Sequence, residues 1–182
     1  MFLNRLFSRN PHGDAAHALY GIAVARAREP YFYASLGVPD TLEGRFEMIT
    51  LHVYLLLRRL KAERDATADG VAQALFDLMF ADMDRNLREM GAGDLGVGRR
   101  VKTMAQAFYG RVSAYDEGLE ADDASLSAAL TRNVYAGADG QEAGAAQLAE
   151  YLRAADKVLA GGDGAALIRG AASFGPLPVK PS

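Results

Sequence analysis

Apolar residues recur at helical spacing along most of the chain, and no segment shows the strict alternation of apolar and polar positions that is typical of a half-buried strand. The pattern is widest in 40–63, where apolar side chains spread nearly all round the helix axis, as in a central helix. Its main face consists of Phe46, Ile49, Val53, Leu56, Leu57 and Leu60. The remaining polar positions form a row with seven-residue spacing, Arg45, His52 and Arg59, which we expect to pair with acidic side chains of the neighbouring helix.

Capping and turn signals divide the rest of the chain into helices. Asp14 can cap a first helix that ends before Pro30, and Asp40 with Glu43 forms a capping box at the start of the 40–63 helix. Further helices are predicted from about 67 to 91, after 94, around 125–135, and between the glycine-rich turns 137–140 and 161–164. The sequence therefore predicts an all-α fold, a single compact bundle of about six to seven helices with no sheet.

Three regions follow from this pattern: a short apolar and basic segment at 1–12, an all-α domain at 13–172, and a proline-rich tail at 173–182. The first segment lacks the apolar region and cleavage site of a signal peptide. Its four large apolar side chains are Phe2, Leu3, Leu6 and Phe7. They could lie at a membrane interface as a small amphipathic turn, or pack on the core of the domain. No apolar run approaches the roughly 18–20 residues that span a bilayer.

Composition excludes several classes of site. The chain has 182 residues and no cysteine, so disulfides, thiol catalysis and thiolate metal sites are excluded. The net charge of −3 gives no general reason to expect nucleic acid as a partner. His12, His17 and His52 are too scattered for a zinc or haem motif, and His52 is expected to be a hydrogen-bonded polar residue rather than a ligand.

A glycine-rich segment at 91–96 matches the nucleotide-binding pattern G-x-G-x-x-G. That fingerprint requires a strand before the glycines and a helix after them. Here the segment follows a predicted helix, and Gly91 lies where a glycine C-cap belongs. We therefore interpret these glycines as a corner between two helices. No catalytic signature such as G-x-S-x-G or H-E-x-x-H is present, so the sequence does not indicate an enzyme.

Acidic side chains in 76–90 do not form a metal site. Asp77 and Asp84 share a helix face but have no His or Glu at the spacing that would complete a carboxylate site. Arg88 lies four residues after Asp84, so an ion pair on the helix surface is the simpler interpretation, and both acids are also the expected partners of the polar row. Asp82 lies at the margin of the apolar face, and we expect it to be buried and to need a hydrogen-bond partner.

Basic side chains gather just after the corner, at Arg99, Arg100 and Lys102. Cations are unfavourable at a helix N-terminus, so their presence indicates either an anionic partner or a solvated basic turn.

Two segments, 27–52 and 75–115, resemble the ubiquinol–cytochrome c chaperone family. The matching motifs are Arg28-x-Pro30 with Phe32-Tyr33, Gly37-Val-Pro-Asp-Thr41, Arg45-Phe46, Leu51-His52, Phe76-Asp77, Asp82-Met-Asp84, Leu87-Arg-Glu-Met-Gly91, Asp94, Val97-Gly98 and Phe108-Tyr-Gly-Arg111. The resemblance is dense over about 15–116 and looser in the remainder.

The resemblance implies a non-enzymatic assembly factor that binds newly made cytochrome b and assists its maturation into ubiquinol–cytochrome c reductase. It supplies no catalytic residues and no cofactor. The chain begins close to the first family motif, so we expect a bacterial protein in the cytoplasm, with possible peripheral contact to the cytoplasmic face of the inner membrane through the N-terminal segment.

We expect cytochrome b to dock on the face bordered by the second, third and fourth predicted helices. The candidate contacts are Arg45, Asp77, Asp84, Arg88, Arg99, Arg100, Lys102, Tyr109 and Arg111. The alternative is a helical protein that binds a small molecule or lipid in a pocket between the second and fourth of these helices. Its candidate lining is Met79, Met83, Met90, Phe108 and Tyr109, which could equally be ordinary core residues. A closed apolar cavity beside Asp82 would favour this alternative, and an open groove rimmed by polar residues would favour the chaperone.

Overall fold

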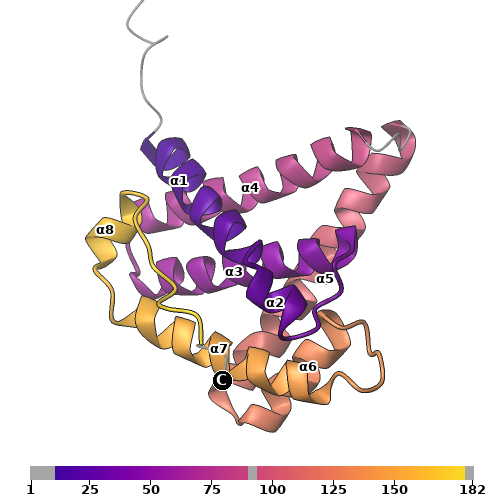
Figure 1. The fold of residues 1–182 in the computed structure, drawn as a ribbon. Helices are drawn as coiled ribbons and strands as arrows, with labels where there is room; N and C mark the ends of the chain where they lie inside the picture. The colour runs from indigo at the N-terminus through magenta and orange to yellow at the C-terminus, as the bar shows by residue number, and fades with distance from the viewer. Residues whose placement is uncertain (1–10, 90–93, 179–182) are drawn as a thin grey trace, which may run out of the picture.

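The computed structural model describes residues 11–89 and 94–178, and within this part it contains eight α-helices and no strand. The helices are α1 (Pro11–Ala27), α2 (Pro30–Ala34), α3 (Leu42–Ala62), α4 (Ala66–Glu89), α5 (Asp94–Glu120), α6 (Asp123–Asn133), α7 (Glu142–Ala160) and α8 (Gly164–Ile168). Helix α1 packs on α3 and α4, α7 packs on α3 and α6, and α5 packs on α4 and α6 (Figure 1). The predicted all-α class is confirmed. None of the described helices combines the length and apolar character needed to cross a bilayer.

Helix α3 is the centre of the fold, as its all-round apolar pattern predicts. Ten of its residues are buried, among them Leu51, Leu55 and Leu56 with no exposed surface. Its N-cap is Thr41, whose hydroxyl accepts a hydrogen bond from the Gly44 amide at 3.1 Å. The predicted cap at Asp40 is therefore wrong by one residue, because the Asp40 carboxylate is instead paired with Arg45.

Both the start of α4 and its buried face follow from patterns that are visible in the sequence. The Asp65 carboxylate accepts hydrogen bonds from the amides of Thr67 and Ala68 at 2.8 and 3.1 Å, so it satisfies two donors of the first turn. The buried face repeats at three- and four-residue intervals. It consists of Ala68, Val71, Leu75, Met79, Phe80 and Met83. The predicted glycine cap at Gly91 lies outside the described residues.

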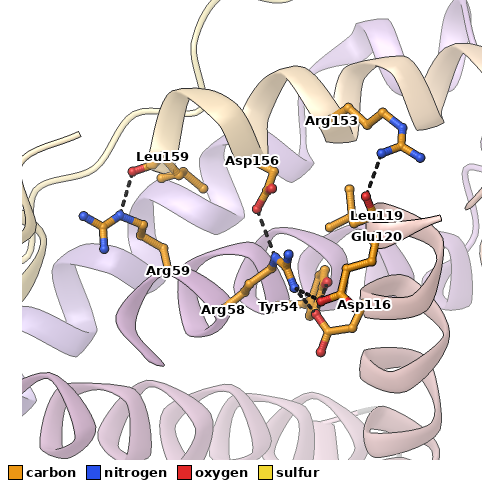
Figure 2. Close-up of polar contacts among 9 residues, drawn as sticks. All are labelled: Tyr54, Arg58, Arg59, Asp116, Leu119, Glu120, Arg153, Asp156 and Leu159. Carbon is orange, nitrogen blue, oxygen red and sulfur yellow. Dashed lines mark hydrogen bonds and ion pairs between the residues drawn. The ribbon is translucent and has the colours of Figure 1, made fainter. Parts of the chain in front are cut away.

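Arginine side chains hold α3, α5 and α7 together (Figure 2). Arg58 of α3 donates to Asp116 of α5 at 2.5 Å and to Asp156 of α7 at 3.3 Å. Arg153 of α7 donates to the carbonyl oxygens of Gly118 and Leu119 at 2.8 Å each, where the last carbonyls of α5 have no intrahelical partner. These contacts join three helices that are far apart in the sequence.

Two members of the polar row on α3, His52 and Arg59, face α7 rather than α4. Arg59 donates to the carbonyl oxygen of Leu159 at 2.8 Å (Figure 2). It also donates to the carbonyl oxygen of Gly162 at 3.2 Å and pairs with Glu63. His52 reaches Tyr151 of α7. The expected pairing of this row with Asp77 or Asp84 is wrong, because α7 packs along the side of α3 that carries His52 and Arg59, and Arg45 pairs with Asp40.

His52 is completely buried, and both of its ring nitrogens have partners. Nδ1 lies 2.7 Å from the Met48 carbonyl oxygen and Nε2 lies 2.8 Å from the Tyr151 hydroxyl, so the neutral ring donates to the carbonyl and accepts from the hydroxyl. Burial lowers the pKa of His52 to about 4. The expectation of a hydrogen-bonded rather than ligating histidine is confirmed.

The start of the proline-rich segment packs on the same core. Phe174 is buried, and its ring meets the edge of His52 with a centroid separation of 5.0 Å. The carbonyl oxygen of Gly175 accepts a hydrogen bond from Arg26 of α1 at 2.6 Å. Residues 173–175 therefore cover the buried histidine.

Candidate functional site

An apolar groove of about 610 Å³ lies between α3, α4 and α5. Helix α3 contributes Leu42, Glu43, Phe46, Glu47 and Thr50; α4 contributes Phe80, Met83 and Leu87; and α5 contributes Thr103, Met104, Ala107, Phe108 and Arg111. We call this set the groove. Its volume lies within the range of known ligand sites.

The groove exists because α5 does not pack closely along α3. The backbone of α5 lies against α4 and α6, and long side chains span the distance from α5 to α3. Arg111 reaches Glu47, and Asp116 accepts from the hydroxyl of Tyr54 at 2.7 Å. The rings of Tyr54 and Tyr115 meet between the two helices with a centroid separation of 5.5 Å.

One ion pair interrupts the apolar wall of the groove. Arg111 Nε donates to Glu47 Oε2 at 2.7 Å, and Nη2 donates to Oε1, so the pair is bidentate. The two side chains are only 23% and 18% exposed. Burial raises the pKa of the Glu47 carboxyl more than the Arg111 guanidinium lowers it. The two charges neutralise each other, so the pair adds no net charge to the apolar wall, and Glu43 is the remaining charged side chain among the described lining residues.

Among the predicted contact residues with described side chains, Arg111 lines the groove. The others lie outside the groove on α3, α4 and α5. Arg45 is exposed and paired with Asp40 at 2.6 Å. Asp77 is exposed and accepts from Gln73 at 2.8 Å. The structure therefore does not bring these residues together into one compact site.

The remaining predicted contacts are on α4 and α5. Asp84 and Arg88 form the expected ion pair at 2.6 Å. Tyr109 is 64% exposed and lies beside Phe76, with a centroid separation of 5.9 Å. Lys102 is exposed, whereas the side chains of Arg99 and Arg100 lie outside the described part of the structure. The role of all nine residues in binding stays a prediction.

The groove lies where the sequence placed the alternative pocket, but only some of the expected lining residues line it. Met83 and Phe108 are on the wall. Met79 is fully buried in the core, Tyr109 is exposed, and Met90 lies outside the described residues. Sequence reasoning missed Leu42 and Glu47. One signal could have identified Glu47: it is a carboxylate within a helix that is apolar nearly all round.

Asp82 is half-buried and does not line the groove. Its carboxylate accepts a hydrogen bond from the Tyr20 hydroxyl of α1 at 2.8 Å, and it also pairs with Arg85. Burial raises the pKa of Asp82, but hydrogen bonds from Arg85 and Tyr20 lower it further, so the net pKa is below its usual range. The expected hydrogen-bond partner is thus present, and it ties α4 to α1.

The described residues contain no group of three or more His, Asp or Glu side chains that could hold a metal ion. The groove therefore offers shape and apolar contact, with Thr50, Thr103 and the ion pair as its polar groups besides Glu43 at its edge.

Comparison with known proteins agrees with the resemblance seen in the sequence. The model of the family described as "Ubiquinol-cytochrome C chaperone" matches residues 34–174. The chain belongs to this family. The match includes every described residue that lines the groove.

Curated relatives in this family are named as assembly factors. Ubiquinol-cytochrome-c reductase complex assembly factor 1 of Xenopus laevis is 32% identical over 120 residues, which are 66% of this chain and 60% of that protein. Its Drosophila melanogaster counterpart is 29% identical over 142 residues, 76% of this chain and 55% of that protein. The chain thus spans little more than half the length of these relatives.

A solved structure shares the whole fold. The crystal structure of the Cbp3 homolog from Brucella abortus is 38% identical and superposes with a TM-score of 0.84, covering 97% of this chain and 98% of that one. Protein CBP3 of Saccharomyces cerevisiae is 31% identical over 109 residues, which are 59% of this chain and 32% of that protein.

Proposed function

We propose that this protein is a non-enzymatic assembly factor of ubiquinol–cytochrome c reductase, and that its client, the protein it assists, is newly made cytochrome b. Family membership supports the role in assembly, since its relatives are named as assembly factors of this complex. The observation that carries the binding mode is the apolar groove between α3, α4 and α5.

The groove fits an apolar helical segment. Leu42 and Thr50 mark its extent on α3, and eight residues of helix rise about 12 Å, which is close to two helical turns of a client. An amphipathic or apolar helix in such a groove contributes side chains at three- and four-residue spacing. A segment awaiting insertion into the membrane has such side chains exposed to water. Covering them in the groove would prevent aggregation until the segment is inserted.

The ion pair in the groove adds selectivity to this binding mode. Burying Glu47 and Arg111 further under a client costs desolvation, although each already has the other as a partner. A charged side chain entering the groove would lose its hydration, and both charges of the pair already have a partner. We therefore propose that the groove accepts neutral segments and rejects charged ones.

The polar residues predicted from the sequence are proposed to contact the client at the rim. Arg45, Asp84, Arg88 and Lys102 belong to the three helices that form the groove. Exposed charges at a rim mainly influence association rates and orientation. Apolar contact in the groove then provides most of the affinity.

Substitution at the mouth of the groove tests this function. Leu42 is 39% exposed and is the first residue of α3, where an acidic side chain suits the helix dipole, so Leu42→Asp should fold normally. It places a charge against the apolar client, and we expect cytochrome b to be lost from the purified complex. Val158 of α7 is 40% exposed and does not line the groove, so Val158→Asp is the matched control. Equal recovery of cytochrome b with both variants would refute the groove as the client site.

We also propose that the protein works in the cytoplasm and touches the inner membrane peripherally through Phe2, Leu3, Leu6 and Phe7. Flotation with vesicles containing anionic lipid tests this contact. We expect wild-type protein to float and a Phe2→Ser, Phe7→Ser variant to remain at the bottom. Failure of the wild type to float would remove the membrane contact and leave the groove proposal intact.

The alternative function, binding of a small molecule or lipid, uses the same groove. Its volume of about 610 Å³ and its aromatic and methionine side chains suit an apolar ligand. Native mass spectrometry of the purified protein distinguishes the two. A retained small molecule, lost in Leu42→Asp, together with unchanged cytochrome b binding, would favour the alternative.

A further inference from the structure

Glycines in the interior of the described helices fall into two groups. Gly44, Gly118 and Gly144 are required by packing, because a Cβ at each would lie within 3.0 Å of a neighbouring backbone atom, whereas a Cβ at Gly70 would meet the ring of His12. A Cβ at Gly118, for example, would lie 2.8 Å from the Cα of Leu126. A Cβ at Gly21 of α1 or at Gly110 of α5 would meet nothing within 4 Å. A glycine there weakens the helix without any gain in packing.

Gly110 lies at a boundary within α5. On its C-terminal side, residues 111–120 are held to other helices by Arg111–Glu47, by Asp116 with Tyr54 and Arg58, and by Arg153 of α7. The first of these anchors, Arg111, directly follows the glycine. This half of α5 is therefore fixed to α3 and α7.

The N-terminal side of Gly110 is held differently. Phe108 is buried against Phe76 and Phe80, with centroid separations of 5.5 and 6.0 Å, and both partners belong to α4. The same half contributes Met104 and Ala107 to the wall of the groove. The hydrophobic contribution of such contacts is non-directional, whereas bidentate ion pairs are directional.

A Cβ at Gly21 would also meet nothing within 4 Å, but the helix around Gly21 is packed differently. It lies on α1 between Leu19 and Ala23, which are both fully buried, and further buried alanines follow on either side. Bending α1 there would open packed core on both sides. Gly21 is thus a matched control for Gly110.

We infer that α5 bends at Gly110, so that residues 94–109 move as one wall of the groove while residues 111–120 stay fixed. The groove widens to admit a client segment and narrows once the segment is bound. This inference rests on the proposed function for its purpose, but the bending itself can be measured without a client.

Distance measurement between spin labels tests the bending first. The chain has no cysteine, so labels can be placed at will. Lys61 on α3, Lys102 on the N-terminal half of α5 and Glu117 on its C-terminal half are all exposed. We expect a broad distance distribution for the 61–102 pair and a narrow one for the 61–117 pair. Gly110→Ala should narrow the first, since alanine favours the straight helix by about fivefold, and Gly21→Ala should leave it unchanged. Equally narrow distributions in the wild type would overturn the hinge.

Co-purification of cytochrome b tests the consequence. Gly110→Ala should raise the melting temperature and lower cytochrome b recovery, whereas Gly21→Ala should raise the melting temperature alone. Moving the glycine by one turn, in the double variant Gln106→Gly, Gly110→Ala, should restore recovery, because Gln106 is exposed and the helix can bend there instead. Recovery that stays low in the double variant would show that the surface at 110, not flexibility, is what the client requires. If wild-type protein captures no cytochrome b, the proposed client fails and the distance distributions still decide the hinge.

Discussion

At the scale of single residues, the buried polar groups are the most informative. His52 is neutral in the fold because burial lowers its pKa to about 4, from an ordinary value of 6.5. In the unfolded chain the same ring takes up a proton as the pH falls below 6.5. The unfolded state therefore binds more protons than the folded state between these two values. The free energy of unfolding must decrease as the pH falls through this window.

This linkage gives a prediction for pH dependence. From about pH 7 to about pH 5, His52 alone should lower the free energy of unfolding by about 2 kcal/mol. Urea denaturation at the two pH values measures it. His52→Gln cannot take up the proton, so its free energy of unfolding should change less with pH by that amount. Parallel pH dependence in the wild type and the variant would show that the ring is not held neutral.

The groove ion pair gives a second prediction at this scale. Arg111→Met leaves the Glu47 carboxylate half-buried without its partner and should cost about 2–3 kcal/mol of stability. The double variant Glu47→Met, Arg111→Met removes both charges and should lie within about 1 kcal/mol of the wild type. Denaturation of the wild type, Glu47→Met, Arg111→Met and the double variant completes the double-mutant cycle. Additive losses in the double variant would mean that the two side chains are not coupled.

At the scale of elements, the arginine contacts with helix ends explain how α7 is fastened to α3. Arg59 donates to the carbonyl oxygen of Leu159 in the last turn of α7 (Figure 2) and to that of Gly162 just beyond the helix. Arg59→Met should cost about 1–2 kcal/mol. Lys61→Met, an exposed position on the same helix, is the control and should have little effect. Thermal unfolding compares them, and equal melting temperatures would show that the contact adds nothing.

The same scale shows what sequence reasoning can and cannot reach. Helix boundaries depend on local signals, so α3, α4 and α7 lie within a few residues of where periodicity and turn residues place them. Pairing between helices depends on which helix packs on which face. That is why the sequence pattern predicts the wrong neighbouring helix for His52 and Arg59, which contact α7.

The candidate site, too, could be predicted from the sequence only in part. The space between the second, third and fourth predicted helices was expected, and a groove lies there. Charged residues near it were favoured as contacts because charge is visible in a sequence. Leu42 and Glu47 were missed, since the exposure of Leu42 and the burial of Glu47 depend on how α5 lies relative to α3.

At the scale of the whole molecule, recognition is proposed to combine the groove with a basic region at the start of α5. Reversing the charges of Arg99 and Arg100 to Glu should weaken the capture of cytochrome b by about tenfold at low salt, and less at high salt, because exposed charges are screened. Co-purification at two salt concentrations measures this. Undiminished capture by a folded double variant would remove both residues from the proposed surface.

The central claim is that this chain supports assembly of ubiquinol–cytochrome c reductase through its groove. A strain that lacks the gene should be complemented with the wild type, with Leu42→Asp or with Val158→Asp, and cytochrome b should be measured by reduced-minus-oxidised spectroscopy of its membranes. We predict that wild type and Val158→Asp restore the cytochrome b signal and that Leu42→Asp, at equal protein level, does not. A normal signal in the uncomplemented strain would contradict the assembly role, and full restoration by Leu42→Asp would contradict the role of the groove.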